Sequence, residues 1–203
     1  MSSATEQYIP CREIPDRLEI QQGDTLLLTS DILRLAMKAR KHEKSFDQNQ
    51  FLDAFINKLG PDGTLMLPSY NFDLESGDHF SIRDTLPMTG ALAVAAMERE
   101  DFIRTSNPLH SFLVSGADAA MLAGLQNASS FGPGSPFAYL LEKDAMMVFA
   151  GTSLAEAMTF VHYAEESMQV KYRRYKTYHI NYYDEGGNIS RRIFKLYSKK
   201  PGY

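Results

Sequence analysis

The chain has 203 residues, 44% of them hydrophobic, which is typical of one folded domain with a sizeable core. Its formal net charge of −4 argues against a dedicated nucleic-acid binder, because a surface that follows phosphates needs a basic excess. The single cysteine, Cys11, excludes an internal disulfide and a zinc site built on several thiolates. We therefore expect a single domain that binds a small molecule, with neither nucleic acid nor metal.

The N-terminal stretch MSSATEQYIPCREIPDR carries charges and prolines where a signal peptide needs an apolar run of about 7–15 residues. No apolar run in the sequence reaches the roughly 18 residues that are needed to span a bilayer. The expectation is a soluble, cytoplasmic protein that does not interact with a membrane.

The first half of the chain alternates predicted strands with predicted helices. Short apolar runs at 24–30 (DTLLLTS) and 63–70 (GTLMLPSY) are typical of strands buried on both faces of a sheet. Between them, apolar residues recur at helical spacing in two stretches that a polar break at 41–44 separates. The sequence GPDG at 60–63 ends the second helix. The polar segment 71–87 is predicted to be a long loop, and long loops in compact domains often carry function.

The second half continues the alternation and ends in a hairpin. Its predicted elements are a helix at 89–98, strands at 102–106 and 111–115, a helix at 117–125, a strand at 144–151 and a helix at 154–167. Two aromatic and β-branched runs, 177–183 and 189–197, flank the sequence DEGGN and predict an antiparallel hairpin. Together these elements predict a layered α/β domain with a mixed sheet.

The sequence SNPLHS at 106–111 places His110 just after a proline, at the start of a predicted strand. Histidine can take and return a proton near neutral pH, because its ordinary pKa is about 6.5. His110 is therefore a candidate catalytic residue. The alternative is a structural histidine whose ring is satisfied by backbone hydrogen bonds.

The sequence FVHYAEE at 160–166 lies on a predicted helix, so His162, Glu165 and Glu166 are expected to project from one face. Such a cluster could hold a cationic amine, orient another histidine, or bind a metal if the fold supplied a second histidine ligand. The alternative is a solvated helix face with an incidental ion pair.

Two further places could meet a ligand. The turn FGPGSP at 131–136 precedes a helix with Ser135 at its N-cap, where free backbone N–H groups favour phosphate, although most such turns only reverse the chain. Thr29 and Ser30 end the first strand at the edge where open α/β sheets bind ligands, or they cap the next helix. Neither a Walker loop, a GxGxxG fingerprint nor a GxSxG elbow is present.

Taken in chain order, these segments resemble the aminoglycoside 3-N-acetyltransferase family, also called the antibiotic N-acetyltransferase family. The matching pieces are GDTLLLTSDILRL (23–35), LGPDGTLMLPSY (59–70), PMTGALAVAAMERE (87–100), IRTSNPLHSFLVSG (103–116), FGPGSPFAYLLEKDAMMVFAG (131–151), and FVHYAEE (160–166) followed by KYRRYKTY (171–178). The resemblance implies a three-layer α/β/α sandwich with a mixed sheet and a C-terminal antiparallel hairpin. It also implies acetyl transfer from acetyl-CoA to an amino group of a sugar-like acceptor.

The resemblance places the general base on His110, with His162 and Glu165 in the acceptor pocket, where they orient the base or hold the ammonium group. Acetyl-CoA, the co-substrate, is expected at Thr29, Ser30, Ser135 and Pro136, with Met88, Thr89 and Gly90 lining the same cleft. An amine is protonated at pH 7, so a base must remove a proton before the nitrogen attacks the thioester. We expect a ternary complex without an acyl-enzyme, because Cys11 lies outside every motif.

The chain departs from the family pattern in two places. Asn107 stands where the family commonly has the first histidine of a pair, and the chain ends soon after the hairpin. We therefore expect one domain over residues 1–203, shortened at its C-terminus. Both departures fall near the acceptor side, which favours a biosynthetic amino sugar, for example from a surface polysaccharide, over antibiotic resistance.

Two alternatives to the acetyltransferase stay open. The first is a catalytically weak relative that binds a CoA ester or a sugar without turnover. The second is a metal-dependent hydrolase that uses His110, His162 and Glu165. The apolar and aromatic hairpin would also suit a homodimer interface, because exposed strand edges pair readily.

Overall fold

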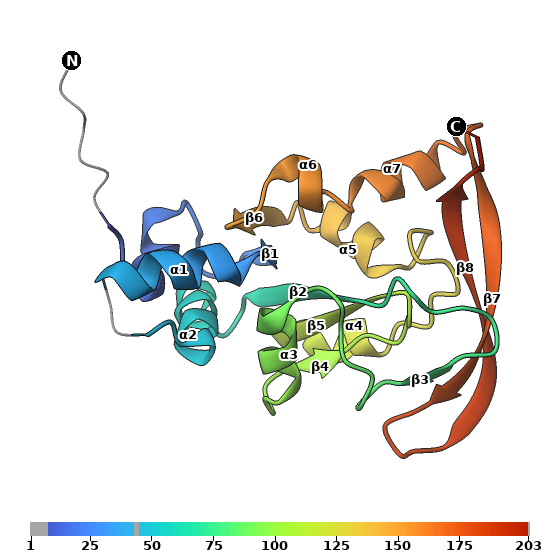
Figure 1. Ribbon diagram of the computed structural model, residues 1–203, viewed down its shortest axis with the longest axis horizontal. Helices are drawn as coiled ribbons and strands as arrows, with labels where there is room; N and C mark the ends of the chain where they lie inside the picture. Colours follow the sequence, from blue (N-terminus) through green and yellow to red (C-terminus); the bar gives the residue numbers. More distant parts are fainter. Residues whose placement is uncertain (1–7, 43–44, 203) are drawn as a thin grey trace.

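The computed structural model describes residues 8–42 and 45–202, which fold around a five-stranded sheet (Figure 1). The strands of this sheet, which has the order β4-β5-β2-β1-β6, are β1 (Thr25–Ser30), β2 (Thr64–Tyr70), β4 (Ile103–Arg104), β5 (His110–Gly116) and β6 (Met146–Ala150). Strand β1 pairs in parallel with β2 and β6, whereas β5 is antiparallel to both β2 and β4. The predicted mixed sheet is confirmed.

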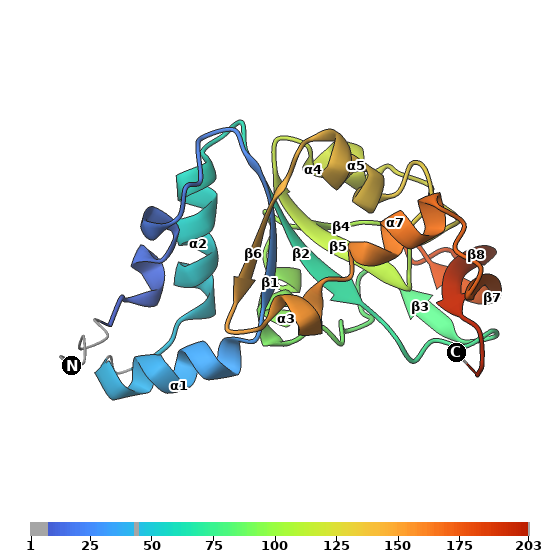
Figure 2. The same ribbon diagram turned by 90° about the horizontal axis from the view of Figure 1, so that it is seen from above.

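Helices cover both faces of this sheet. They are α1 (Ile32–His42), α2 (Gln48–Leu59), α3 (Ala91–Met97), α4 (Ala119–Ala123), α5 (Pro136–Glu142), α6 (Leu154–Ala157) and α7 (Val161–Ser167), preceded by short 3-10 helices at Cys11–Glu13 and Pro15–Arg17. Helices α1 and α2 lie on one side of the sheet, and α4 and α5 on the other (Figure 2). None of the helices within the described ranges is long and apolar enough to cross a membrane.

The apolar run of β1 explains why this strand is buried on both faces. Leu26 and Leu28 pack into the core that contains the apolar residues of α2 and α3. Leu27 points the opposite way and packs into the second core, with Phe137 of α5. Because successive side chains of a strand alternate between faces, a continuous apolar run needs a layer of helices on each side. The three-layer α/β/α sandwich is therefore confirmed.

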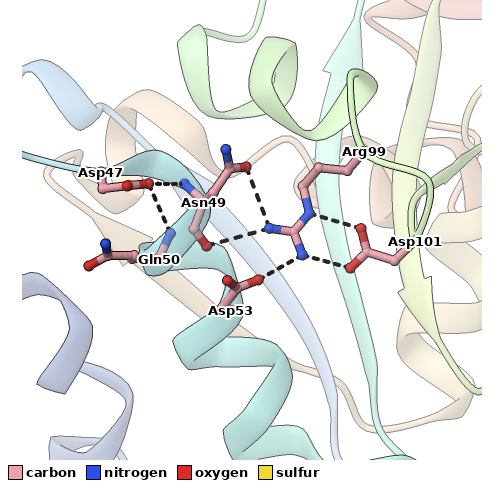
Figure 3. Close-up of polar contacts among 6 residues, drawn as sticks. All are labelled: Asp47, Asn49, Gln50, Asp53, Arg99 and Asp101. Atoms are coloured by element: carbon pink, nitrogen blue, oxygen red, sulfur yellow. Dashed lines mark hydrogen bonds and ion pairs between the residues drawn. The ribbon is translucent and has the colours of Figure 1, made fainter.

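Arg99 ties the turn after α3 to helix α2 (Figure 3). Its guanidinium donates to both carboxylate oxygens of Asp101, at 2.8 and 2.7 Å, and to Asp53 of α2 at 2.7 Å. The hydrogen bond from Arg99, followed by its charge, lowers the pKa of Asp101 against the opposing effect of burial. Asp47 caps the same helix, because its Oδ1 accepts two backbone N–H groups of the first turn. These contacts fix α2 and α3 on the same face of the sheet.

A second sheet lies beyond the central one (Figure 1). It contains β3 (His79–Ser81), β7 (Arg173–Tyr183) and β8 (Ile189–Lys199), in the order β3-β7-β8. Strands β7 and β8 are antiparallel, which confirms the predicted hairpin and extends both of its strands. Strand β3 lies inside the segment predicted as a loop and pairs in parallel with β7. Its sequence, HFS, buries only Phe80, so it carries no strand pattern.

The helix predicted at 154–167 is divided into α6 and α7. A capping box formed by Ser153 and Glu156 starts α6. The chain then leaves the helical conformation at Met158, where φ is −80° and ψ is 60°. Thr159 follows and faces the same cavity as Tyr70. The break gives α7 its own direction, which sets where His162 lies.

Candidate active site

A cavity of about 200 Å³ lies at the edge of the central sheet where the parallel strands β1 and β2 end. Apolar side chains of β1, β2 and α3 form much of its wall, among them Leu28, Leu67 and Leu92. Its hydroxyl-bearing residues are Thr29, Ser30, Tyr70, Thr89, Thr152 and Thr159, and its lining carboxylate belongs to Glu156. Such a lining suits a neutral chain with a few polar groups, since open α/β sheets bind ligands at this edge.

Two of the four residues expected to receive acetyl-CoA line this cavity, namely Thr29 and Ser30, together with Thr89, which was expected to line the same cleft. The hydroxyl of Thr89 donates to the carbonyl oxygen of Pro68 at 2.5 Å, which fixes the start of the segment that leads into α3. Met88 and Gly90 flank Thr89 without lining the cavity.

Ser135 and Pro136 do not line the cavity. The hydroxyl oxygen of Ser135 accepts a hydrogen bond from the backbone N–H of Ala138 at 3.3 Å, so Ser135 is the N-cap of α5. Both residues are buried, with Ser135 only 1% exposed. The structure thus places Thr29 and Ser30 at the cavity and Ser135 and Pro136 away from it, with Ser135 as a helix cap.

His110 is the first residue of β5 and lies opposite Tyr70 of β2. It is 6% exposed, and its Nδ1 lies 3.1 Å from the hydroxyl oxygen of Ser130. Burial, followed by the charge of His162, lowers the pKa of His110 to about 3. The imidazole is therefore uncharged at neutral pH and is a weak base.

Asn107 shapes the turn that leads into β5. Its Oδ1 accepts hydrogen bonds from the backbone N–H groups of Leu109, at 3.1 Å, and His110, at 3.2 Å. Its amide nitrogen donates to the carbonyl oxygen of Asn127 at 3.3 Å, and the residue is fully buried. Asparagine makes such local turns readily, so a structural role accounts for this residue.

His162 and Glu165 form the pair that the i, i+3 spacing predicted. His162 Nδ1 lies 2.6 Å from Glu165 Oε2, and the side chains are 32% and 15% exposed. Among the residues that the structure describes, polar partners are found only at Nδ1 of this ring. Glu165 and Arg173 thus both contact the ring at Nδ1.

Ring contacts connect the cavity to His162. The ring of Tyr70, which lines the cavity, lies 4.8 Å from that of His110. Phe131 contacts both imidazoles, with its ring centroid 4.6 Å from His110 and 5.3 Å from His162.

Within the described part of the chain, no group of three His, Cys, Asp or Glu side chains is arranged to hold a metal ion.

Glu166 does not join this pair, although its i, i+4 position led us to expect it there. It is 4% exposed and accepts hydrogen bonds from Ser129 Oγ at 2.6 Å and from the Tyr175 hydroxyl at 3.1 Å. The predicted three-residue cluster is thus reduced to His162 and Glu165.

Tyr172 and Arg173 complete the surroundings of Glu165, and sequence reasoning gave neither a role. The Tyr172 hydroxyl donates to Glu165 Oε1 at 2.6 Å, and Arg173 Nε lies 2.8 Å from Glu165 Oε2. Burial acts to raise the pKa of Glu165, but the hydrogen bonds from Tyr172 and His162 and the charge of Arg173 outweigh it and lower the pKa. Both residues follow a chain reversal at Gln169, where φ is 48°. The sequence there contains no turn motif that would predict this reversal.

The model of the aminoglycoside 3-N-acetyltransferase family matches residues 36–200. The chain belongs to this family. Aminoglycoside 3-N-acetyltransferases use acetyl-CoA as their co-substrate, so the expected enzyme class, an acetyl-CoA-dependent acetyltransferase, is confirmed at the level of the family. No curated protein sequence matches the chain.

Solved structures with the same fold include enzymes of the aminoglycoside 3-N-acetyltransferase family. AAC-IIIb in a binary complex with CoASH has a TM-score of 0.77 and 18% identity, over 93% of this chain and 74% of its own. AAC-VIa bound to sisomicin has a TM-score of 0.75 and 22% identity, over 93% and 74%. The YokD protein from Bacillus subtilis has a TM-score of 0.75 and 16% identity, over 94% and 81%. At these identities the likeness confirms the fold.

Proposed function

We propose that the chain transfers the acetyl group of acetyl-CoA to an amino group of an amino-sugar-like acceptor, either an aminoglycoside or a biosynthetic amino sugar, with His162 as the general base. The observation that carries the proposal is the 2.6 Å contact between His162 Nδ1 and Glu165 Oε2 on a ring that is one-third exposed. Family membership and the CoASH and sisomicin complexes of AAC-IIIb and AAC-VIa support the two substrate classes.

The choice of His162 over His110 rests on burial. The base must reach the ammonium group of the acceptor, and it works best with a pKa near the working pH. His110 is 6% exposed and its pKa is lowered to about 3, so it would accept a proton only at a large free-energy cost. His162 is more exposed, and Glu165 stabilises the imidazolium that forms when His162 takes the proton.

The cavity at the ends of β1 and β2 is our proposed place for the thioester end of acetyl-CoA. Thr29, Ser30 and Thr89 supply hydroxyl groups between apolar walls, which suits a neutral thioester and its chain. Cys11 packs into the core with α2 and is not part of this lining. We therefore propose direct attack of the acceptor nitrogen on the thioester carbonyl. One proton of the acceptor ammonium is lost to solvent before the attack; a second passes from nitrogen to His162 and then to the sulfur as the C–S bond breaks, so that coenzyme A leaves as the thiol.

The acceptor class is not narrowed by Asn107. Its side chain is fully buried in the turn before β5, where it holds two backbone N–H groups. The departure from the family at this position is therefore explained by local structure, and both an aminoglycoside and a biosynthetic amino sugar stay within the proposal.

The test is release of free thiol from acetyl-CoA in the presence of aminoglycosides and simple amino sugars. His162→Ala should lower kcat by about 10²–10⁴-fold, whereas His110→Gln should lower it by less than about tenfold. The reverse order of effects would return the role of base to His110. Stabilisation by acetyl-CoA without thiol release from any acceptor would instead support a binding protein without turnover.

A further inference from the structure

Arg173, the first residue of β7, reaches both members of the His162–Glu165 pair. Its Nε lies 2.8 Å from Glu165 Oε2, and its Nη2 lies 2.9 Å from His162 Nδ1. Its Nη1 donates to the carbonyl oxygen of Tyr197 on β8 at 2.8 Å, and the side chain is only 12% exposed. The hairpin thus holds a cation against the base and its carboxylate.

His162 Nδ1 cannot satisfy both neighbours at once. With a proton on Nδ1, the ring donates to Glu165 Oε2 at 2.6 Å, and the lone pair is on Nε2. Without that proton, Nδ1 accepts from Arg173 and the proton sits on Nε2, where it blocks the uptake of another. Only the first arrangement leaves Nε2 free to act as a base.

Without a nearby cation, the Glu165 carboxylate would favour an imidazole ring with too many protons. An unopposed carboxylate 2.6 Å from an imidazole favours the doubly protonated ring, and an imidazolium has no lone pair with which to accept a proton. The cation of Arg173 lies against the same carboxylate oxygen and the same ring nitrogen, and it disfavours a second positive charge there.

We propose that Arg173 is a positioning residue for acetyl transfer, because its charge offsets that of Glu165 and so disfavours the imidazolium of His162. The neutral tautomer whose Nδ1–H donates to Glu165 then has the Nε2 lone pair that takes the proton of the acceptor. The inference rests on the proposed role of His162. Arginine suits this position because one planar guanidinium lies against Glu165 and also donates to the backbone of Tyr197, whereas a lysine ammonium is a single point charge.

Apart from Glu165 and Arg173, the groups near the His162 ring named below carry no charge that would oppose Glu165. On α7 the nearest charge is Glu165, and Tyr172 donates to the second oxygen of that carboxylate at 2.6 Å. From β5, His110 faces the ring across Phe131 and is uncharged, because burial lowers its pKa to about 3. Arg173 is therefore the cation that opposes Glu165 at this site.

The experiment follows the ring protons of His162 by NMR against pH in the full chain. The chain has five histidines, and His162→Gln assigns the signal. In Arg173→Gln the titration midpoint of His162 should rise by about one pH unit, and the acid limb of the kcat profile should move with it. Glu165→Gln should move both the other way. The exposed neighbour Arg174, changed to Gln, is the matched control and should move neither.

An unchanged midpoint in Arg173→Gln, or a loss of kcat that is equal at every pH, would show that Arg173 only supports the fold. If Arg173→Gln does not fold, Tyr172→Phe provides the second test. It removes one hydrogen bond from Glu165 and should raise the midpoint by less, about half a pH unit. A risen midpoint without acetyl transfer by the unmodified chain would keep the electrostatic role of Arg173 and remove the proposed function.

Discussion

The Nδ1 atom of His110 lies 3.1 Å from the hydroxyl oxygen of Ser130, inside a cage of aromatic rings. Tyr70, Phe131 and Phe137 contact the imidazole, at ring-centroid distances of 4.8, 4.6 and 6.4 Å. The ring is thus removed from water but keeps one hydrogen bond. Because an imidazolium would lose its hydration here, folding holds His110 in its neutral form.

This burial predicts that the protein loses stability in acid. Burial, followed by the charge of His162, lowers the pKa of His110 to about 3, below its ordinary value of 6.5. The unfolded chain therefore binds more protons between these two pH values, and the free energy of unfolding falls as the pH falls through this range. The contribution of His110 is about 1.4 kcal/mol per pH unit at most.

Urea denaturation at several pH values between 7 and 4 measures this slope. The substitution His110→Gln keeps a polar group near Ser130 but removes the titrating ring, so its stability should depend less on pH. Equal slopes for the two proteins would show that His110 does not titrate differently in the folded and unfolded states.

Thr29 and Ser135 were both expected to receive acetyl-CoA, and the structure predicts that they behave differently. Thr29→Val removes one hydroxyl from the cavity while keeping the side-chain shape. It should weaken acetyl-CoA binding by roughly 2–10-fold, the equivalent of one hydrogen bond. Ser135→Ala removes the N-cap of α5 and should cost about 1 kcal/mol of stability.

Thermal-shift titration with acetyl-CoA separates the two effects, because a ligand that binds the folded state stabilises it according to its dissociation constant. Ser135→Ala should start from a lower melting temperature and show the same dissociation constant as the unmodified chain. A weakened dissociation constant in Ser135→Ala would return this residue to the binding site.

The central sheet could be predicted because the apolar sequences of its strands show that they are buried. The apolar runs of β1 and β2 need cover on both faces, so they indicate the layers as well as the strands. Strand β3 could not be predicted in the same way. His79 and Ser81 on either side of Phe80 are not apolar. This strand forms because its backbone pairs in parallel with the edge of β7.

In the candidate site, too, the contacts set by local spacing could be predicted, and those that depend on distant segments could not. The contact between His162 and Glu165 follows from helical spacing, which the sequence shows directly. The burial of His110 depends on Phe131 and Phe137, which come from a distant part of the chain. Arg173 reaches the pair only after the reversal near Gln169, and no local pattern encodes that approach.

The adjacent residues Glu165 and Glu166 give the last prediction, because they have the same chemistry and different surroundings. Glu165 contacts His162 and Arg173 and is part of the proposed base. Glu166 holds Ser129 through Oε1, and its Oε2 is buried without a partner among the described residues. A buried carboxyl oxygen without a partner costs free energy, so the replacement of this carboxyl group is tolerated if the Ser129 contact is kept.

Glu166→Gln keeps an acceptor for the Ser129 hydroxyl, and it should leave kcat unchanged and the free energy of unfolding within about 1 kcal/mol. Glu165→Gln should lower kcat, by about 10-fold or more, because the imidazolium of His162 loses its counter-charge. Thiol-release kinetics and urea denaturation of both variants make the comparison. A similar loss of kcat in both would mean that the two carboxylates act together, as the spacing of the helix alone first indicated.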